Sequence, residues 1–161
     1  KYFNQKTTNP ESIRDSEGFR EYISWIWLFK ENAFFNLRYD FNQDRAEGIY
    51  WESLTHRITA NLSIPLFSEE TAKGVGQLNL QVAGGAALQD YRNDQPYMDN
   101  DGNPGMIKRK DTLYTGSLGL SWAFSKFASF IVQASRTKND SNIPVNKYER
   151  DLYMSGFEFR Y

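Results

Sequence analysis

The sequence predicts an all-β fold in which antiparallel strands follow one another up and down around a barrel. Apolar and polar residues alternate along most of the chain, and a strand separates such sets onto two faces, whereas a helix would scatter them around its axis. Short polar or glycine-containing segments divide these stretches, and no apolar run approaches the roughly 20 residues of a membrane helix. Seven strands are expected, at about residues 19–29, 33–41, 50–67, 77–91, 111–124, 127–137 and 149–161.

Composition limits the classes of protein to which the chain can belong. Its 161 residues suffice for one domain, and a net charge of −1 gives no electrostatic basis for binding nucleic acid. Cysteine is absent, which excludes disulfides, thiol catalysis and zinc–thiolate sites. The mean hydropathy of −0.67 is that of a water-soluble protein. Barrel strands conceal their apolar face by alternation, however, so hydropathy does not separate a soluble protein from a membrane barrel.

The clearest alternation lies in residues 50–67. One face carries Leu54, His56, Ile58, Ala60, Leu62, Ile64 and Leu66, and the other carries Thr55, Arg57, Thr59, Asn61 and Ser63. The strands at 33–41, 77–91 and 127–137 divide in the same way. The strand at 19–29 is apolar on both faces, so its orientation is the least defined.

The connections between strands alternate in length. Those at residues 30–32 and 125–126 are tight, and polar loops are expected at 42–48, 91–110 and 137–147. A turn expected at 68–76 departs from this alternation. Short turns on one side and long loops on the other are typical of a transmembrane β-barrel, with the short turns in the periplasm. This orientation predicts one aromatic belt at the outer interface, with Tyr39, Tyr50, Tyr114 and Tyr153, and one at the inner interface, with Trp122, Phe124, Phe159 and Tyr161.

The last strand carries a specific resemblance. Its sequence, DLYMSGFEFRY, alternates aromatic and polar residues and ends on an aromatic carboxyl terminus. It resembles the closing strand of Gram-negative outer-membrane β-barrels, with Gly156, Phe159 and Tyr161 at the places of that family's pattern, while Met154 departs from it. The resemblance implies that the barrel-assembly machinery reads these three residues. Residues 135–161 also look like porin-type barrels, and like barrels joined to helical-repeat domains that export exopolysaccharide or move lipoproteins to the cell surface.

Seven strands are an odd number, and single-chain bacterial barrels have even numbers. Residues 1–18 contain Pro10 and show no alternation, so they are expected to form an extracellular loop or a cleaved segment rather than an eighth strand. An open sheet would leave edges that cannot face lipid. The chain is therefore expected to be the C-terminal part of a larger barrel, whose remaining N-terminal part is one of its partners.

If the apolar faces meet lipid, the opposite faces line the lumen. The lumen-facing candidates are Arg38, Asp40, Arg57, Asn61, Asn79, Gln81, Gln133, Glu158 and Arg160. Charges of both signs on these faces suit either a hydrated interior or a plugged one. The plainer interpretation is a polar network that only stiffens the wall.

Two other features invite a chemical interpretation. His56 is the single histidine, and it falls on the apolar face, where a catalytic base would have neither a substrate nor an orienting partner, so no enzyme is expected. Asp99 and Asp101 lie in a segment rich in Asn, Asp and Gly that departs from the EF-hand pattern. A solvated turn is the default there, with an irregular cation site as the weaker reading. No cofactor is expected. Lys108, Arg109 and Lys110 form a short basic run, for which solvated loop charge is the default and contact with lipopolysaccharide phosphates the alternative.

The sequence as a whole favours an integral protein of the bacterial outer membrane. Its expected function is that of a pore or translocation channel that passes a solute or polymer through a polar lumen. A structural barrel that holds a partner protein is the first alternative, an outer-membrane barrel enzyme is a less favoured one, and a soluble β-sandwich or lipocalin-like barrel is another. The expected surroundings are outer-membrane lipid and lipopolysaccharide.

Overall fold

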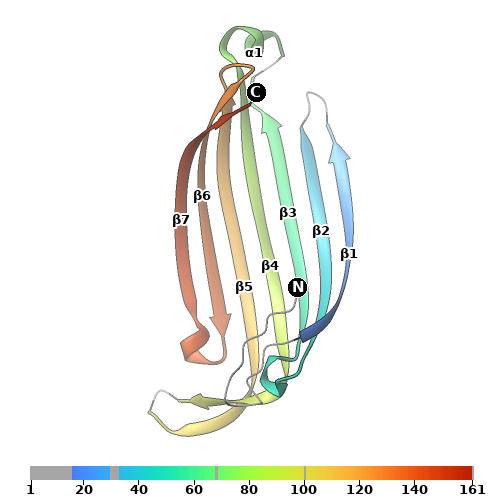
Figure 1. Ribbon diagram of the computed structural model, residues 1–161, viewed down its shortest axis with the longest axis vertical. Coiled ribbons are helices and arrows are strands. Elements are labelled where there is room, and N and C mark those ends of the chain that lie inside the picture. The colour runs from blue at the N-terminus through green and yellow to red at the C-terminus, as the bar shows by residue number, and fades with distance from the viewer. Residues whose placement is uncertain (1–15, 30–32, 68, 100, 161) are drawn as a thin grey trace.

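The computed structural model describes residues 16–29, 33–67, 69–99 and 101–160. They form seven antiparallel strands in one sheet, which confirms the predicted all-β, up-and-down arrangement (Figure 1). The strands are β1 (Ser16–Leu28), β2 (Phe34–Ala46), β3 (Ser53–Pro65), β4 (Gln77–Met98), β5 (Pro104–Ala123), β6 (Ala128–Ser141) and β7 (Tyr148–Phe159).

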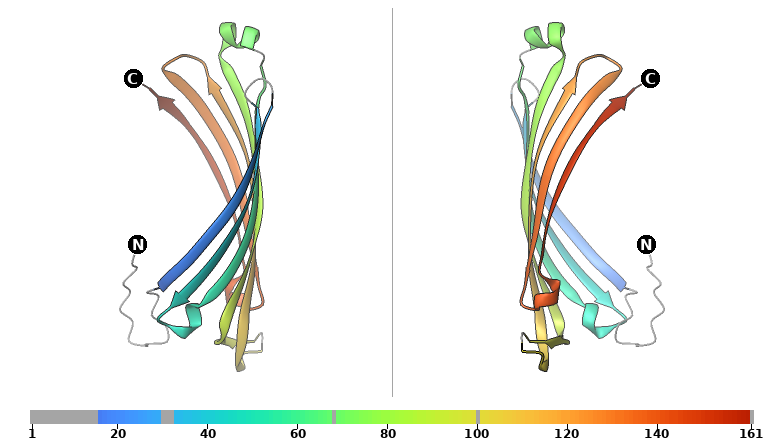
Figure 2. Two further views of the ribbon diagram at one scale, coloured as in Figure 1. Left: turned by 90° about the vertical axis from the view of Figure 1, so that its right-hand side faces the viewer. Right: turned by 90° about the vertical axis from the view of Figure 1, so that its left-hand side faces the viewer.

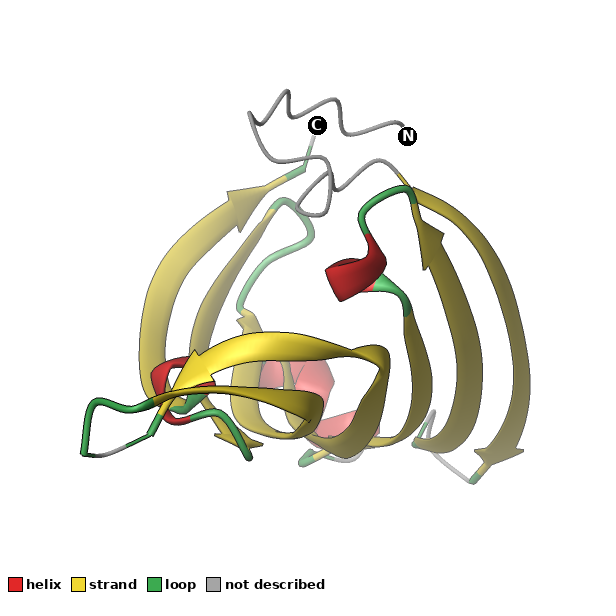
Figure 3. Cartoon of the chain, turned by 90° about the horizontal axis from the view of Figure 1, so that it is seen from below, coloured by secondary structure: helices red, strands yellow, loops and turns green. Residues whose placement is uncertain are grey.

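Each strand pairs with the next one in the chain, so the order in space is β1 to β7. The described sheet is open: β1 and β7 form its two edges and do not pair with each other. Viewed along the strands it curves like a horseshoe (Figure 3), and in side view its edge strands cross because the twist accumulates over seven strands (Figure 2). A closed barrel is therefore not what these residues form by themselves.

The hairpin of β4 and β5 is the longest and extends beyond the rest of the sheet (Figure 1). The prediction of a loop at residues 91–110 is wrong over much of that range, because Asp94–Met98 pairs with Pro104–Lys108 as strand. An irregularity in the register lies between Asp90 and Asp94. A tight turn closes the hairpin, where the Asp99 N–H donates to the Asn103 carbonyl at 3.0 Å. This pairing depends on backbone hydrogen bonds, which the polarity of the side chains does not report.

Three short helices occupy connections: η3 (Ile49–Trp51), α1 (Glu69–Val75) and η4 (Pro144–Asn146). Helix α1 lies where only a turn was expected. Strands β2 and β6 run into the loops expected at 42–48 and 137–147. Of the predicted N-terminal segment, residues 1–15 lie outside the described part of the chain, and residues 16–18 belong to β1 rather than to a loop.

The two faces of the sheet differ sharply in polarity. One hollow is lined by side chains from Arg20 on β1 to Tyr148 on β7, which is possible only on the inside of the curve, here called the concave face. The register places the predicted polar sets on this face and the apolar sets on the outside, the convex face.

Burial reverses the distribution of a water-soluble domain. Among the described residues, four apolar residues are buried, namely Ala87, Tyr91, Ala128 and Ile143, against seven polar or charged ones: Asp40, Ser53, Gln95, Asp111, Ser129, Asn139 and Ser141. The convex face exposes large apolar side chains on every strand, including Trp25, Tyr39, Ile58, Val82, Leu118, Val132 and Phe157. So many large apolar side chains exposed on one face are unusual for a water-soluble domain.

Candidate functional site

The charges of the concave face gather around Asp40 on β2. Asp40 is 4% exposed and accepts hydrogen bonds from Arg20, across the β1–β2 ladder, and from Arg38, two residues along its own strand. The Arg20 Nη2 to Asp40 Oδ1 distance is 2.8 Å, and the Arg38 Nε to Asp40 Oδ2 distance is 2.9 Å. Alternate residues of a strand share a face, which is why Arg38 and Asp40 meet. The Arg38 guanidinium also lies 3.9 Å from the centroid of the Tyr22 ring.

Arg57 on β3 stands directly opposite Asp40 in the β2–β3 register. Its side chain is exposed, and the described residues give it no ion pair and no hydrogen bond. Both oxygens of Asp40 are already occupied by Arg20 and Arg38. The site therefore combines three arginines with one carboxylate.

A second ion pair lies on β5, where the Nε of Arg109 is 2.9 Å from Asp111 Oδ2. The Arg109 guanidinium is 4.5 Å from the centroid of the Tyr91 ring. Arg109, Asp111 and Tyr91 line the same hollow as Arg20, Asp40 and Arg57, with a volume of about 390 Å³, here called the arginine hollow.

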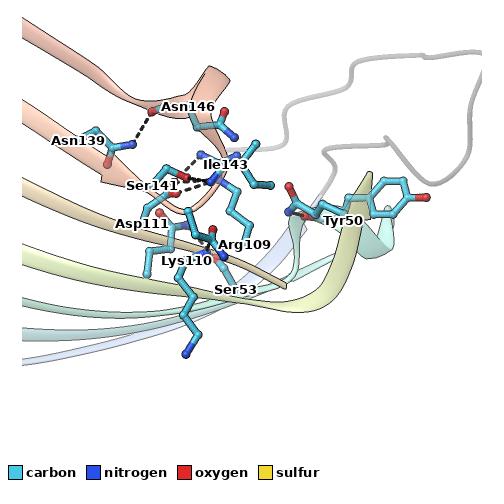
Figure 4. Close-up of polar contacts among 12 residues, drawn as sticks. Tyr50, Ser53, Arg109, Lys110, Asp111, Asn139, Ser141, Ile143 and Asn146 are labelled. Atoms are coloured by element: carbon cyan, nitrogen blue, oxygen red, sulfur yellow. Dashed lines mark hydrogen bonds and ion pairs between the residues drawn. The ribbon is translucent and has the colours of Figure 1, made fainter. Parts of the chain in front are cut away.

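The turn around η4 is fixed beside this ion pair (Figure 4). Asn139 donates to the Asn146 carbonyl at 2.8 Å, and the Ile143 N–H donates to Ser141 Oγ at 3.1 Å. Ile143 is 3% exposed, so its side chain anchors the connection between β6 and β7. These contacts give one end of the concave face a defined shape.

A larger hollow of about 870 Å³ continues along the concave face. It brings together four of the predicted lumen-facing residues, Arg38, Asn61, Gln81 and Gln133. Its other polar lining is neutral, and includes Asn36, which donates to Ser24 Oγ at 3.0 Å. Arg38 is the only charged residue that lines this neutral hollow among the described residues.

The remaining predicted lumen candidates also fall on the concave side. Asn79 pairs with Ser121 in the β4–β5 register, away from both hollows. Glu158 pairs with Ser129, and the Arg160 Nη2 lies 3.1 Å from Glu158 Oε2 at the far end of the sheet. The structure thus places Arg38, Asp40 and Arg57 side by side, and Asn79, Glu158 and Arg160 elsewhere on the same face.

The sequence interpretation missed Arg20, Arg109 and Asp111. Arg20 lies on the strand whose faces were both apolar, Arg109 lies in the segment expected to be a loop, and Asp111 lies at the first position of the next expected strand. A usable signal was present: Arg38-Tyr39-Asp40 and Arg109-Lys110-Asp111 share the spacing Arg-x-Asp, and each forms an ion pair along one strand. On a strand this spacing puts opposite charges on the same face.

His56 lies on the convex face among aromatic residues. Its Nδ1 is 2.7 Å from the Tyr39 hydroxyl, and its ring centroid is 5.3 Å from that of Phe41. The face is the one predicted. The pair with Tyr39 fixes the imidazole in the wall of the sheet.

The two ends of the convex face carry different kinds of side chain, aromatic at one end and charged at the other. Near α1, aromatic rings contact one another, with centroids 5.6 Å apart for Trp122 and Phe124 and 5.0 Å apart for Phe130 and Phe157. At the opposite end, β6 and β7 carry a mixed charged cluster, in which Arg136 Nη2 lies 2.6 Å from Glu149 Oε2 and Lys138 Nζ lies 3.7 Å from Glu149 Oε1.

The short basic run is divided between the two faces, because Arg109 faces the arginine hollow and Lys110 lies 3.7 Å from Asp90. Of the predicted assembly residues, Gly156 and Phe159 lie on the edge strand β7, and Tyr161 is outside the described residues.

The two weak cation candidates lie at the tip of the β4–β5 hairpin. Asp99 Oδ1 accepts hydrogen bonds from the backbone N–H of Asn103 at 2.7 Å and of Asp101 at 3.0 Å. These hydrogen bonds lower the pKa of the Asp99 carboxyl, and the bond from the Asn103 backbone contributes most. The Asp99 carboxylate is therefore used by the turn itself.

Within the described ranges, no group of three or more His, Asp or Glu side chains is placed to hold a metal ion. No helix in the same ranges is long and apolar enough to span a membrane. The chain matches no protein-family model, no curated protein and no solved structure.

Proposed function

We propose that this chain forms part of the wall of an outer-membrane β-barrel channel, and that its concave face lines the path of a solute or polymer. The observation that carries the proposal is the reversed distribution of polarity. Buried polar side chains lie inside the curve, and most of the large exposed apolar side chains lie outside it, although Tyr22, Ile26 and Phe34 on β1 and β2 are exposed on the inside. A transmembrane barrel needs this arrangement, since its outside meets lipid and its inside meets water.

The ends of the convex face support the same proposal. Aromatic rings collect at the α1 end, and ion pairs between Arg136, Lys138 and Glu149 occupy the opposite end. Interfacial aromatic residues and charges beyond the apolar band are typical of membrane barrels. The charged end then meets lipopolysaccharide, and the α1 end lies in the periplasm.

The open edges imply further strands. Within the described residues, β1 and β7 each pair with a neighbouring strand on one side only, and lipid cannot satisfy the backbone groups of the other side. We propose that other strands of the same barrel close the sheet. The exposed edge strand β7, with Gly156 and Phe159, would be the segment that the barrel-assembly machinery engages during this closure.

Planar-bilayer recording on the full-length protein tests the proposed channel. The expected result is stepwise ion conductance after insertion of the folded protein. A folded barrel that inserts but does not conduct would instead support the structural alternative, in which a partner protein fills the interior. Extraction from cell membranes without detergent would contradict both and favour a soluble β-protein.

A further inference from the structure

We propose that Arg57 is an anion-binding residue of the concave face and makes the passage selective for solutes that carry a carboxylate or a phosphate. This inference rests on the proposed channel function for its role in transport, although the binding site itself can be tested without conductance.

The first argument is the balance of charge on the concave face. On the concave face the arginines outnumber the carboxylates: Arg20, Arg38, Arg57, Arg109, Arg150 and Arg160 stand against Asp40, Asp44, Asp111 and Glu158. Most of these charges neutralise one another in ion pairs, with Arg109 on Asp111 and Arg160 on Glu158. Among the described residues, Arg57 and Arg150 are the arginines of this face without an ion pair, and Arg20 and Arg38 share the single carboxylate of Asp40.

The second argument is that Asp40 cannot neutralise Arg57. A carboxylate has about four sites for accepting hydrogen bonds. Asp40 receives four, two from Arg20 and two from Arg38. Arg57 is next to this group in the register and has no ion pair within the described residues. Its guanidinium keeps five N–H donors, arranged in a fork that fits a carboxylate or phosphate oxygen pair.

The third argument is the position of Arg57. It lines the arginine hollow, and Arg38, two pairs further along the β2–β3 ladder, lines the neutral hollow. The three arginines around Asp40 therefore lie where the two hollows adjoin. The other carboxylates of the arginine hollow do not pair with Arg57: Asp111 binds Arg109, and Asp44 accepts the amide of Asn42 at 2.7 Å. An anion that passes from one hollow to the other meets the unpaired guanidinium.

The surroundings of Arg57 suit a transient ligand. Thr55 and Thr59 flank it on the same face of β3, and Gln89 reaches the same hollow from β4. Their hydroxyl and amide groups can donate further hydrogen bonds to an anion. Because the site is exposed and open, binding is expected to be weak and exchange fast, as passage through a pore requires.

The test compares Arg57→Gln with Arg136→Gln in the full-length protein. The second variant removes the same charge from the convex face, where Arg136 pairs with Glu149. Reversal potentials in asymmetric KCl should show that Arg57→Gln lowers the permeability of chloride relative to potassium by about twofold or more. Arg136→Gln should leave that ratio unchanged. Heat-induced unfolding of each variant in detergent verifies that it has folded.

A second measurement uses inorganic phosphate and acetate as probes, titrated into the folded protein in detergent and followed by NMR line broadening of the ligand. Both probes should bind the parent and the Arg136→Gln protein more strongly than the Arg57→Gln protein. A conducting parent whose selectivity and binding do not change in Arg57→Gln overturns the inference and leaves the channel intact. A parent that binds phosphate through Arg57 but does not conduct overturns the channel and retains the site.

Discussion

At the scale of single residues, the concave face carries ion pairs between alternate residues of the same strand. Arg38 and Asp40 are two residues apart, and so are Arg109 and Asp111, so that each arginine reaches its carboxylate along the same strand. Each pair is further supported by an aromatic ring, Tyr22 below Arg38 and Tyr91 below Arg109. Rings in these positions restrict the guanidinium without removing its donors. In both places the arginine guanidinium is held by an aspartate on one side and an aromatic ring on the other, and the aspartate oxygens already accept hydrogen bonds from it.

Asp99 gives a prediction that concerns pH. Its pKa is lowered in the folded protein, so the stabilisation of the hairpin tip is fully present above the unfolded value of about 4 and is lost as the pH falls through the lower folded value. NMR of the Asp101 and Asn103 amide protons should show their hydrogen bonds loosening in that acidic range. Asp99→Asn keeps an acceptor but cannot titrate, so its tip should show no such transition. An identical acid transition in that variant would assign the effect to another group.

At the scale of elements, the connection between β3 and β4 depends on one glycine. Gly76 follows α1 with φ of +88°, and its N–H donates to the Ala72 carbonyl at 2.9 Å. A β-carbon at this position would overlap the carbonyl oxygen of Ala123 and the Cα of Phe124, which are backbone atoms and cannot move aside cheaply. Gly102 has a similar φ of +83° but open space around it.

These two glycines form a matched pair of variants. Gly102→Ala should cost only the strain of the left-handed conformation, about 1–2 kcal/mol. Gly76→Ala adds steric overlap and should cost about 3 kcal/mol or more in the free energy of unfolding. Urea unfolding in detergent micelles measures both values. Equal losses of unfolding free energy in the two variants would mean that the backbone at Ala123 and Phe124 moves away from a β-carbon at position 76 without an energetic cost.

Particular elements also show what the sequence could and could not predict. In β3 the alternation was regular, and it correctly placed Arg57 and Asn61 on one face and His56 on the other. In β1 both faces were apolar, so the sequence pattern did not predict which face Arg20 occupies. The pairing of β1 with β2 brings Arg20 to Asp40. The extension of β4 and β5 was missed because a ladder of backbone hydrogen bonds continues through residues that are polar on both faces.

At the scale of the whole molecule, the convex face is stabilised by apolar surroundings and the concave face by polar ones. The described sheet has almost no apolar residue buried within it, so its stability in water cannot come from a conventional core. Its apolar area lies on the convex face and becomes favourable only against another apolar phase. Folding, by this reasoning, is completed when that face is covered, and the polar network around Asp40 then defines the interior.

Neighbouring residues on β4 test this division directly. Val82 lies on the convex face, opposite Leu62 and Leu118 in the register, and Gln81 lies in the neutral hollow. In the proposed membrane barrel, Val82→Arg should lower stability in lipid by about 2–4 kcal/mol, because it would place a charge in the apolar band. Gln81→Arg adds the same side chain to the concave face and should cost much less. Unfolding in lipid vesicles compares the two, and similar losses would contradict the assignment of faces.

The protruding β4–β5 hairpin has a practical consequence. Its tip at Asp101 is exposed, and these 161 residues contain no cysteine that could compete for a thiol reagent. One engineered cysteine at that position would carry a single fluorophore or biotin. For the proposed outer-membrane barrel, labelling of whole cells with a membrane-impermeant maleimide would then report, from living cells rather than from purified protein, on which side of the membrane the hairpin emerges.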